Sequence, residues 1–313
     1  SQHPLGSIFQ TSLMYDIFKE AENYEPIIIG CTDNSGNLTG ILVSGIFSEK
    51  FGSLTSRSIV VGGPLISEGV SLLDFVKEYN KVVESKAIYT RFANLVDRKT
   101  EFDDLVQIGF KFKEHLNYNF DLSIGVDELW KNIHNTRRRQ INRGRKRGIE
   151  VKIMKEIADL DEYYNILKLT YDNAGLPLHE YSYFKSAYDI LKRNNNIIFF
   201  SAYNGSKLIG FRMVLSYENT LYDWFAGDLH EERDKYTNDV LVWEVLKWGA
   251  EQNYNLFDFG GAGDPDKEYG VRDFKKKFGG KEVNFGNYLI VHNKVKYNLV
   301  QKLVPIYKML NKK

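Results

Sequence analysis

The chain has 313 residues, enough for two domains that each bury a core of their own. With 42 basic and 41 acidic residues its formal charge is +1, which excludes a global field that attracts nucleic acid, so any such attraction must come from local clusters. A single cysteine excludes an intrachain disulfide framework. No apolar run approaches the roughly 20 residues that span a bilayer, and the amino terminus lacks a signal-peptide pattern, so we expect a cytoplasmic protein.

Two hairpins of the same pattern lie 170 residues apart. Residues 27–43 and 197–213 each contain an apolar run, a turn rich in Asn, Gly and Ser, and a second apolar run, which is typical of a β-hairpin. Gly40 falls on Gly210, so the offset is 210 − 40 = 170. The sequence therefore predicts an internal repeat.

The elements after each hairpin are duplicated as well. A third strand, a helix and a further strand are predicted at residues 58–62, 72–84 and 87–92, and again at 221–227, 240–252 and 256–259. A hairpin followed by a strand–helix–strand crossover gives a mixed sheet with helices on its faces. The predicted fold class is therefore α/β, with a mixed sheet present twice.

Between the two copies, residues 127–148 are predicted to form a linking helix. Acids at its start and cations at its end suit the helix dipole, and Leu129 and Ile133 recur at helical spacing. We therefore place the first domain at residues 1–148 and the second at residues 149–282.

The end of this helix is strongly basic. Seven of the eleven residues at 137–147, RRRQINRGRKR, are cations, enough to bind phosphates along a nucleic-acid backbone. No aromatic residue is present to stack on bases, so the run fits an RNA backbone or a sugar diphosphate better than base recognition. Arg137, Arg138 and Arg143 are the candidate phosphate-binding residues, and the alternative is a solvated helix end.

Residues 257–280 carry an apolar strand, a glycine-rich turn and then a basic segment, FDFGGAGDPDKEYGVRDFKKKFGG. Asp258 lies near the end of the strand, where open α/β folds place ligands, and is a candidate base or orienting group for an amine, or else a turn cap. Lys275 follows Phe274 on a predicted short helix at residues 269–278. A cation held at the buried edge of this helix can stabilise developing negative charge or a phosphate.

The last segment, residues 294–313, is predicted to be a basic amphipathic helix, with apolar positions that alternate with lysines. We expect its apolar residues to pack against a domain, while contact with a membrane surface stays open. These residues are Leu299, Leu303, Ile306 and Leu310.

The sequence contains no pattern for a bound metal or nucleotide cofactor. Its six histidines are scattered without ligand spacing, and the lone cysteine cannot complete a zinc set. Neither GxxxxGK[ST] nor GxGxxG after a strand is present. We therefore expect no metal site and no bound cofactor.

Six stretches of the chain match the pattern of one protein family. They are HPLGSIFQTS (3–12), GGPL (62–65), DELWKNIHNTRRRQINRGRKRGI (127–149), TYDNAGLP (170–177), FDFGG (257–261) and the spaced motif G-x-x-x-F-K-x-x-F-G (270–279). With the duplicated sheet and the arginine-rich helix, they make nearly the whole chain resemble the Fem family of peptidoglycan bridge aminoacyltransferases.

That resemblance implies two tandem domains of the GNAT acyltransferase fold, with residues 283–313 returning to the first domain. It also implies transfer of an amino acid from aminoacyl-tRNA, with no other cofactor, to an amine of a peptidoglycan precursor. The amine would attack the ester directly, since no Ser/His or Cys/His nucleophile pair is evident. We expect Lys275 and Asp258 to be catalytic, and the expected substrate-binding residues are Phe274, Arg272, Tyr269, Trp224 and Lys19.

The chain departs from the family pattern in three ways. Asn173 stands where the family has an arginine, and residues 178–183 contain no arginine to grip the phosphates of the precursor. The coiled-coil arm of some members is absent, which leaves RNA contact to the arginine-rich helix or the lysines. Lys19 lies one place from the precursor-binding lysine of the family. The identity of the acceptor is therefore left open.

Two other classes of function stay open. An acyl-CoA-dependent N-acyltransferase that acts on a sugar or lipid amine has the same fold, but residues 230–240, HEERDKYTNDV, lack the glycines that let a backbone approach a pyrophosphate. A non-catalytic RNA-binding or scaffold protein is the other class. The expected partners are aminoacyl-tRNA and an amine acceptor rather than DNA. The expected location is the cytoplasm, with a peripheral contact to the inner face of the membrane as an alternative.

Overall fold

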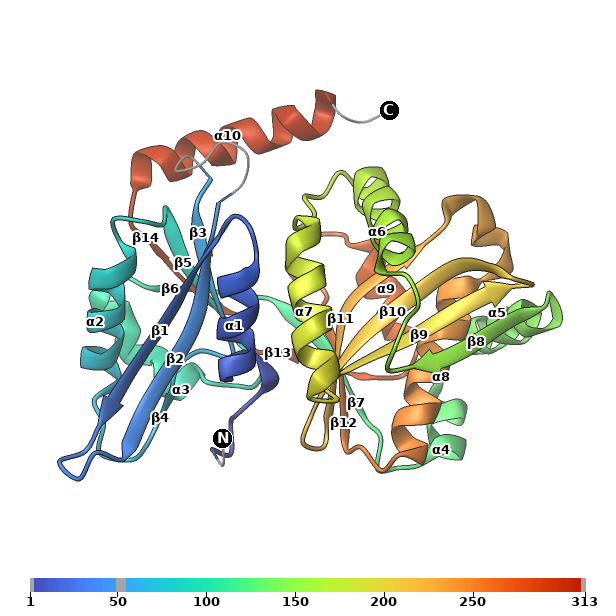
Figure 1. The fold of residues 1–313 in the computed structure, drawn as a ribbon, viewed down its shortest axis with the longest axis horizontal. Helices are drawn as coiled ribbons and strands as arrows, with labels where there is room; N and C mark the ends of the chain where they lie inside the picture. The colour runs from blue at the N-terminus through green and yellow to red at the C-terminus, as the bar shows by residue number, and fades with distance from the viewer. Residues whose placement is uncertain (1–2, 49–54, 311–313) are drawn as a thin grey trace. The chain divides into compact units, whose positions relative to one another are not determined.

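The computed structural model describes residues 3–48 and 55–310, with side chains described as far as Leu303. The chain divides into two compact units. Unit 1 contains Ser1–Glu114, Ser182–Ile190 and Asn284–Lys313, and unit 2 contains His115–Tyr181 and Leu191–Val283. Each unit is built on its own mixed sheet (Figure 1).

The sheet of unit 1 has seven strands in the order β1-β2-β3-β5-β14-β6, and β4 pairs with β2. Strand β14 comes from the C-terminal segment and pairs antiparallel with β5 and β6, so the end of the chain completes this sheet. Figure 1 shows α1 and α2 on opposite faces of it. The strands are β1 Tyr24–Thr32, β2 Leu38–Phe47, β3 Arg57–Val61, β4 Leu65–Ile66, β5 Tyr89–Ala93, β6 Lys111–Lys113 and β14 Asn287–Val291.

The sheet of unit 2 also has seven strands, in the order β13-β7-β12-β11-β10-β9-β8. Helices α6 and α8 lie on its two faces (Figure 1). The strands are β7 Leu116–Asp121, β8 Ile149–Met154, β9 Ile197–Asn204, β10 Lys207–Tyr217, β11 Thr220–Asp228, β12 Leu256–Gly261 and β13 Lys281–Asn284.

The helices fall between these strands, as the crossovers require. Unit 1 contains η1 Ile8–Gln10, α1 Ser12–Glu20, α2 Leu72–Val83, α3 Lys99–Phe102, η3 Asp103–Ile108 and α10 Lys294–Leu310. Unit 2 contains α4 Val126–Asn132, α5 Asn135–Lys146, α6 Leu160–Ala174, η4 His230–Lys235, α8 Thr237–Glu251 and α9 Gly270–Lys276. Helix α7 Tyr181–Arg193 contributes residues to both units. No helix in the described part of the chain is both long and apolar enough to cross a membrane.

The predicted repeat and the α/β mixed-sheet fold class are confirmed. Strands β1 and β2 form an antiparallel hairpin and β3 runs parallel to β5; in unit 2, β9 and β10 form the hairpin and β11 runs parallel to β12. The matched glycines have a packing reason. A Cβ at Gly40 would lie 2.7 Å from the Cys31 sulfur, and a Cβ at Gly210 would lie 2.9 Å from Thr237 Cγ2.

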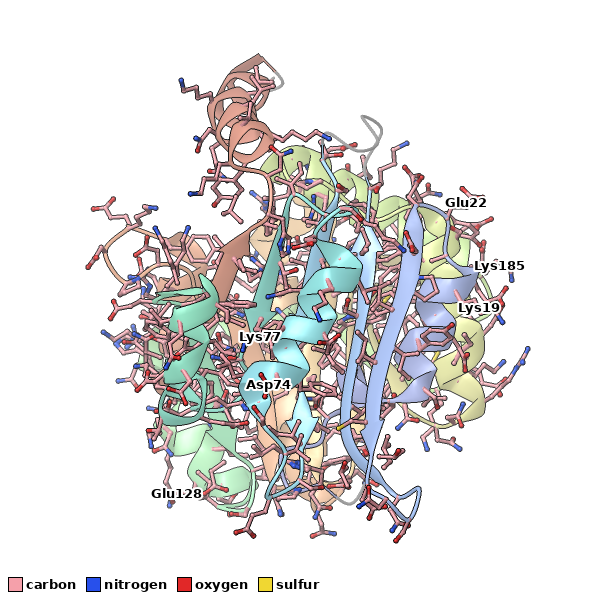
Figure 2. All side chains as sticks on the ribbon, turned by 90° about the vertical axis from the view of Figure 1, so that its left-hand side faces the viewer. Lys19, Glu22, Asp74, Lys77, Glu128 and Lys185 are labelled. Carbon is pink, nitrogen blue, oxygen red and sulfur yellow. The ribbon has the colours of Figure 1, made fainter. Side chains whose placement is uncertain are left out.

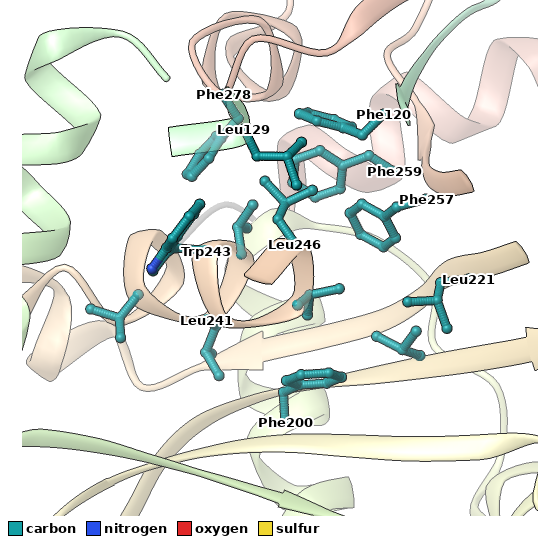
Figure 3. Packing of buried hydrophobic residues seen from close by; sticks show 14 of the residues in the cluster. Phe120, Leu129, Phe200, Leu221, Leu241, Trp243, Leu246, Phe257, Phe259 and Phe278 are labelled. Carbon is teal, nitrogen blue, oxygen red and sulfur yellow. The ribbon is translucent and has the colours of Figure 1, made fainter. Parts of the chain in front are cut away.

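The core of unit 2 forms where α8 packs on the sheet. Its apolar positions are buried on almost every side, which suits a helix covered by a sheet and by two further helices. Figure 3 shows the rings of Phe120, Phe257 and Phe259 gathered beside Leu246 of α8. This core positions the end of β12.

The linking helix predicted at residues 127–148 is two helices, so that prediction was wrong. Helix α4 ends at Asn132, Ile133 takes an extended backbone conformation, and His134 takes a non-helical one before α5 begins. Ile133 is buried, and the backbone N–H of His134 donates to the carbonyl of Lys277 at 2.9 Å. A buried side chain and a long-range hydrogen bond therefore outweigh the continuous helical pattern.

The division between the units also differs from the predicted boundary at residue 148. The structure assigns residues 115–148 to unit 2, because β7 pairs antiparallel with β12 and α5 packs closely against α8. A strand that comes before the second copy in sequence thus belongs to the sheet of that copy. Hydrophobic periodicity within the segment carries no information about which sheet it joins.

Candidate active site

The parallel strands β11 and β12 stop pairing part of the way along their length. Their register ends where Tyr222 lies opposite Asp258. Within these described strands, β11 continues without pairing to β12 as far as Asp228, and β12 continues as far as Gly261. On its other side β12 is irregular before Gly261, where Gly260 takes a φ of 75°. Carbonyl groups of β12 are therefore left for side-chain donors.

Lys275, on α9, supplies these donors. Its Nζ donates to the carbonyl oxygens of Phe259 and of Gly261, the second at 3.1 Å, and lies 4.6 Å from the centre of the Phe259 ring. The residue is 8% exposed. An ammonium has three hydrogens, and two of those on Nζ are used in these bonds to described residues. One N–H is therefore left for another acceptor. A donor fixed in this way stabilises negative charge better than one in bulk water.

Three further charges lie around Lys275: Arg212 and Asp258 are buried, and Asp223 is half-buried. Arg212 on β10 donates from Nη1 to both carboxylate oxygens of Asp223 on β11, at 2.8 and 2.7 Å. Its guanidinium lies 5.2 Å from the centre of the Phe259 ring. With Asp258, the group contains two cations and two anions, and each anion acts electrostatically on Lys275. The charges balance inside unit 2.

Burial moves the pKa values of Asp258 and Lys275 towards each other. It raises the pKa of Asp258 to about 6, although the N–H of Gly260, which donates to Oδ1 at 2.7 Å, and Lys275 both lower it. It lowers the pKa of Lys275 to about 8, although Asp223 and Asp258 raise it. Between these values Asp258 is ionised and Lys275 is protonated, the forms that a carboxylate base and a cationic oxyanion donor require.

We expect Asp258→Asn to change how stability depends on pH. Because the folded pKa is raised from 3.8 to about 6, the folded protein keeps a proton over a range in which the unfolded chain has lost it. The free energy of unfolding of the wild type should fall between about pH 4 and pH 6, by up to about 1.4 kcal/mol per pH unit relative to the variant. Urea unfolding across this range tests the prediction, and parallel curves for the two proteins would contradict it.

Phe274 lies beneath the guanidinium of Arg137, which is 4.4 Å from the centre of its ring and 5.9 Å from that of Phe278. Nη1 of Arg137 also donates to Asp239 at 2.9 Å, in an ion pair whose side chains are 15% and 7% exposed. Burial raises the pKa of Asp239, and Arg137 opposes this shift. Arg137 thus connects α5 to α8 and α9, and its charge is already paired with a carboxylate.

Tyr269 and Arg272 lie at the start of α9, Tyr269 directly before the helix and Arg272 within it, after a turn that follows β12. The guanidinium of Arg272 donates to four backbone carbonyls of this turn, while Tyr269 is exposed directly before the helix. The accepting residues are Ala262, Asp264, Pro265 and Lys267. Arg272 therefore holds together the turn that carries Lys275.

Sequence reasoning missed Arg212 and Asp223. Each is a charge in the interior of a largely apolar strand, KLIGFRMVLSY in β10 and TLYDWFAGD in β11, whose other charge stands at the strand end, and this was the available signal. Trp224 is the extra residue of a β-bulge in β11, because its two neighbours pair with consecutive residues of β10. Its half-buried ring meets that of Phe225 edge-on, with centres 4.8 Å apart.

The other predicted binding residues lie on two different helices. Lys19 is exposed on α1 in unit 1, and Figure 2 shows it at the same edge as Lys185 of α7. Arg138 and Arg143 lie on α5 in unit 2, where Arg138 donates to the side chain of Asn135 and Arg143 is exposed. The structure thus gathers Lys275, Asp258 and Phe274 in unit 2 and places Lys19 in unit 1.

The corresponding strands of unit 1 do not separate in this way. Strands β3 and β5 pair along their whole length, and the N–H of Gly62 continues the pairing to the carbonyl of Ala93 at 2.8 Å. Buried Arg98 then donates to the carbonyls of Gly62 and Pro64, at 2.7 Å each. Among the described residues, separated parallel strands with a group of buried charges therefore occur in unit 2.

The site supplies hydrogen-bond donors rather than metal ligands. Within the described residues, no group of three or more His, Cys, Asp or Glu side chains is placed to hold a metal ion. Asp223 is bound to Arg212, and Asp258 lies within the field of Lys275.

The start of α8, where a GNAT fold would receive a pyrophosphate, is covered by α5. A Cβ at Gly144 would lie 2.8 Å from the carbonyl oxygen of Lys235 and 2.6 Å from Val240 Cγ2. Arg147 donates to the backbone carbonyl of Asp234 and lies 3.2 Å from its carboxylate. Backbone N–H groups at a helix start bind phosphate only where the ligand can approach them. This packing counts against a CoA donor.

Comparison with known proteins identifies two kinds of similarity. The acetyltransferase (GNAT) domain family matches residues 131–276, which include every member of the buried charge group. The lipid II:glycine glycyltransferase of Staphylococcus epidermidis is 23% identical, over 97% of this chain and 92% of that protein. The UDP-N-acetylmuramoylpentapeptide-lysine N(6)-alanyltransferase of Weissella viridescens is 22% identical, over 88% and 86%.

The crystal structure of FemX has the same fold. It superposes with a TM-score of 0.72 at 16% identity and covers 96% of both chains. The likeness therefore extends over both units.

Proposed function

We propose, on the premise that the chain is an aminoacyltransferase of the Fem family built on the GNAT fold, that it transfers an amino acid from aminoacyl-tRNA to an amine of a peptidoglycan precursor. One observation carries the proposal: where β11 and β12 separate, the buried side chains of Lys275, Asp258 and Arg212 lie together with half-buried Asp223, the ion-pair partner of Arg212. The two relatives are named for lipid II and for UDP-N-acetylmuramoylpentapeptide-lysine, which supports this class of acceptor.

In the proposed reaction the acceptor amine attacks the ester carbonyl carbon of aminoacyl-tRNA. A C–N bond forms and the carbonyl oxygen takes up negative charge; the C–O bond to the ribose then breaks, and the amine proton passes to the leaving ribose oxygen. The remaining N–H of Lys275 would bind the oxyanion. Asp258, ionised above about pH 6, would orient the amine or carry its proton.

Two cations of α5, half-buried Arg138 and exposed Arg143, are the proposed contacts with the tRNA backbone. Arg138 and Arg143 keep this role, whereas Arg137 is committed to Asp239 and Phe274. Contacts of this kind add salt-dependent affinity without base recognition. We place the reaction in the cytoplasm, with an acceptor that is lipid-linked at the inner face of the membrane or soluble.

An acyl-CoA donor is the second candidate, because the matching domain family includes acetyltransferases. The packing of Gly144 of α5 against the start of α8 is the observation against it. A donor screen separates the two. Purified protein is mixed with aminoacyl-tRNA or acetyl-CoA and with a muramoyl pentapeptide linked to UDP or to a lipid, and the acceptor is weighed by mass spectrometry.

We expect a mass increase of one aminoacyl residue with the tRNA donor and none with acetyl-CoA, because Gly144 of α5 packs against Lys235 and Val240 at the start of α8. Acylation by the CoA donor alone would overturn the proposal. Acylation by neither donor, with RNA binding retained, would favour the non-catalytic RNA-binding class.

A further inference from the structure

Helix α10 carries an exposed apolar stripe. Val295, Leu299 and Leu303 are 80%, 47% and 51% exposed. They follow one another at four-residue spacing, so their side chains share one side of the helix. The prediction that Leu299 and Leu303 pack against a domain was therefore wrong, and Ile306 and Leu310 lie outside the described side chains. Contiguous exposed apolar surface marks an interaction site.

A different side of α10 packs on unit 1. The helix follows β14 at one end of the sheet (Figure 1), and the ring of Tyr297 meets that of Tyr89 on β5 edge-on, with centres 5.6 Å apart. Tyr297 is two residues from Val295, which turns it by about 200° around the helix. The contact that holds α10 thus leaves the stripe uncovered.

Lysines border the stripe on both sides. Lys296 lies about 60° from Leu299 in one direction around the helix, and Lys302 lies about 60° in the other. Residues 292–313 contain six lysines and no Asp or Glu. Long lysine side chains can extend from an apolar face to reach anions at its edge. An apolar stripe bordered by lysines complements a surface whose outer layer is negatively charged and whose interior is apolar.

We propose that α10 binds the surface of an anionic lipid bilayer, with Val295, Leu299 and Leu303 in the boundary between headgroups and acyl chains and the lysines on the lipid phosphates. A second copy of the helix is a poorer partner. Stripe-to-stripe contact would bring two lysine-rich segments together without acids to pair them. The inference deepens the proposed function. Its consequence, that the enzyme would meet a lipid-linked acceptor at the membrane surface, rests on that proposed function.

Vesicle co-sedimentation of the whole chain tests the inference without tRNA or acceptor. We expect binding to phosphatidylcholine vesicles that contain roughly one quarter phosphatidylglycerol, weakened by salt, and little binding to phosphatidylcholine alone. The double variant Leu299→Asp/Leu303→Asp should lower the partition coefficient at least about tenfold. Lys296→Glu/Lys302→Glu should also lose binding to the anionic vesicles. The control Val106→Asp, at a 58% exposed position of η3 in unit 1, should bind like the wild type.

Three outcomes would overturn the inference. The first is equal or absent binding to the two kinds of vesicle, and the second is unchanged binding of the α10 variants. The third is light scattering that shows a wild-type dimer and a monomeric Leu299→Asp/Leu303→Asp variant, which would make the stripe an interface between copies. The vesicle assay contains no substrate. Absence of vesicle binding would therefore not contradict the proposed transfer reaction, and absence of transfer in the donor screen would not contradict vesicle binding.

Discussion

Lys275→Ala should lower the rate of aminoacyl transfer at least about tenfold, a loss of roughly 1.4 kcal/mol in transition-state stabilisation. The variant lacks the N–H that would face the developing oxyanion. It also leaves the buried carbonyl of Phe259 and the partly buried carbonyl of Gly261 without this donor, at a cost of about 1–3 kcal/mol in stability. The rate is therefore measured in single turnover, at a temperature where circular dichroism shows both proteins to be folded.

Lys276→Ala is the matched control for this variant. Lys276 is the next residue of the same helix and is exposed, so its removal should leave the rate unchanged. The wild-type rate should also fall as the pH rises through about 8, where Lys275 loses its proton. An unchanged rate in Lys275→Ala would remove this lysine from the mechanism, and a loss equal to the unfolded fraction would leave it with a structural role alone.

Arg137→Ala should lower the free energy of unfolding by about 3–5 kcal/mol, because it leaves the carboxylate of Asp239 buried without a partner. The same change removes the cation that covers Phe274. Urea unfolding measures the loss. Arg138→Ala, one position along α5, should change stability by no more than about 0.5 kcal/mol.

A double variant separates a structural role of Arg137 from a phosphate contact. Arg137→Met/Asp239→Leu removes both charges together and should recover most of the stability lost in Arg137→Ala, since apolar side chains replace buried ion pairs at little cost. Its affinity for tRNA should equal that of the wild type. If Arg137→Ala unfolds at the same urea concentration as the wild type but binds RNA more weakly, Arg137 contacts phosphate and its structural role is contradicted.

The duplicated sheet could be predicted because its signals are local. Each hairpin carries its own turn residues and apolar runs, and the matching glycines Gly40 and Gly210 lie where a Cβ would collide with a neighbour. The same holds for the association of Phe274 with Lys275, since both lie on one short helix after a glycine turn. Local patterns of this kind need no knowledge of distant contacts.

The arginine-rich segment shows the limit of such patterns. Its spacing is continuous from Leu129 to Ile141, but the helix is interrupted at Ile133, whose side chain is buried, and at His134, whose N–H donates to the carbonyl of Lys277. Its first arginine looks the same in sequence as its neighbours, although Arg137 alone among the candidates Arg137, Arg138 and Arg143 is paired with Asp239. A charge run does not show which of its members find a buried partner far along the chain.

The amino-acid sequence by itself determined the two mixed sheets and the glycine turn, and it predicted Lys275 and Asp258 as site candidates, because each depends on residues that are close together along the chain. Only the tertiary structure added Arg212 and Asp223 and transferred residues 115–148 to the second unit. It also shifted the pKa values of Lys275 and Asp258. These features depend on desolvation and on contacts between residues far apart in sequence. Both exist only in the folded unit, where β11 and β12 pair along part of their length and diverge along the rest.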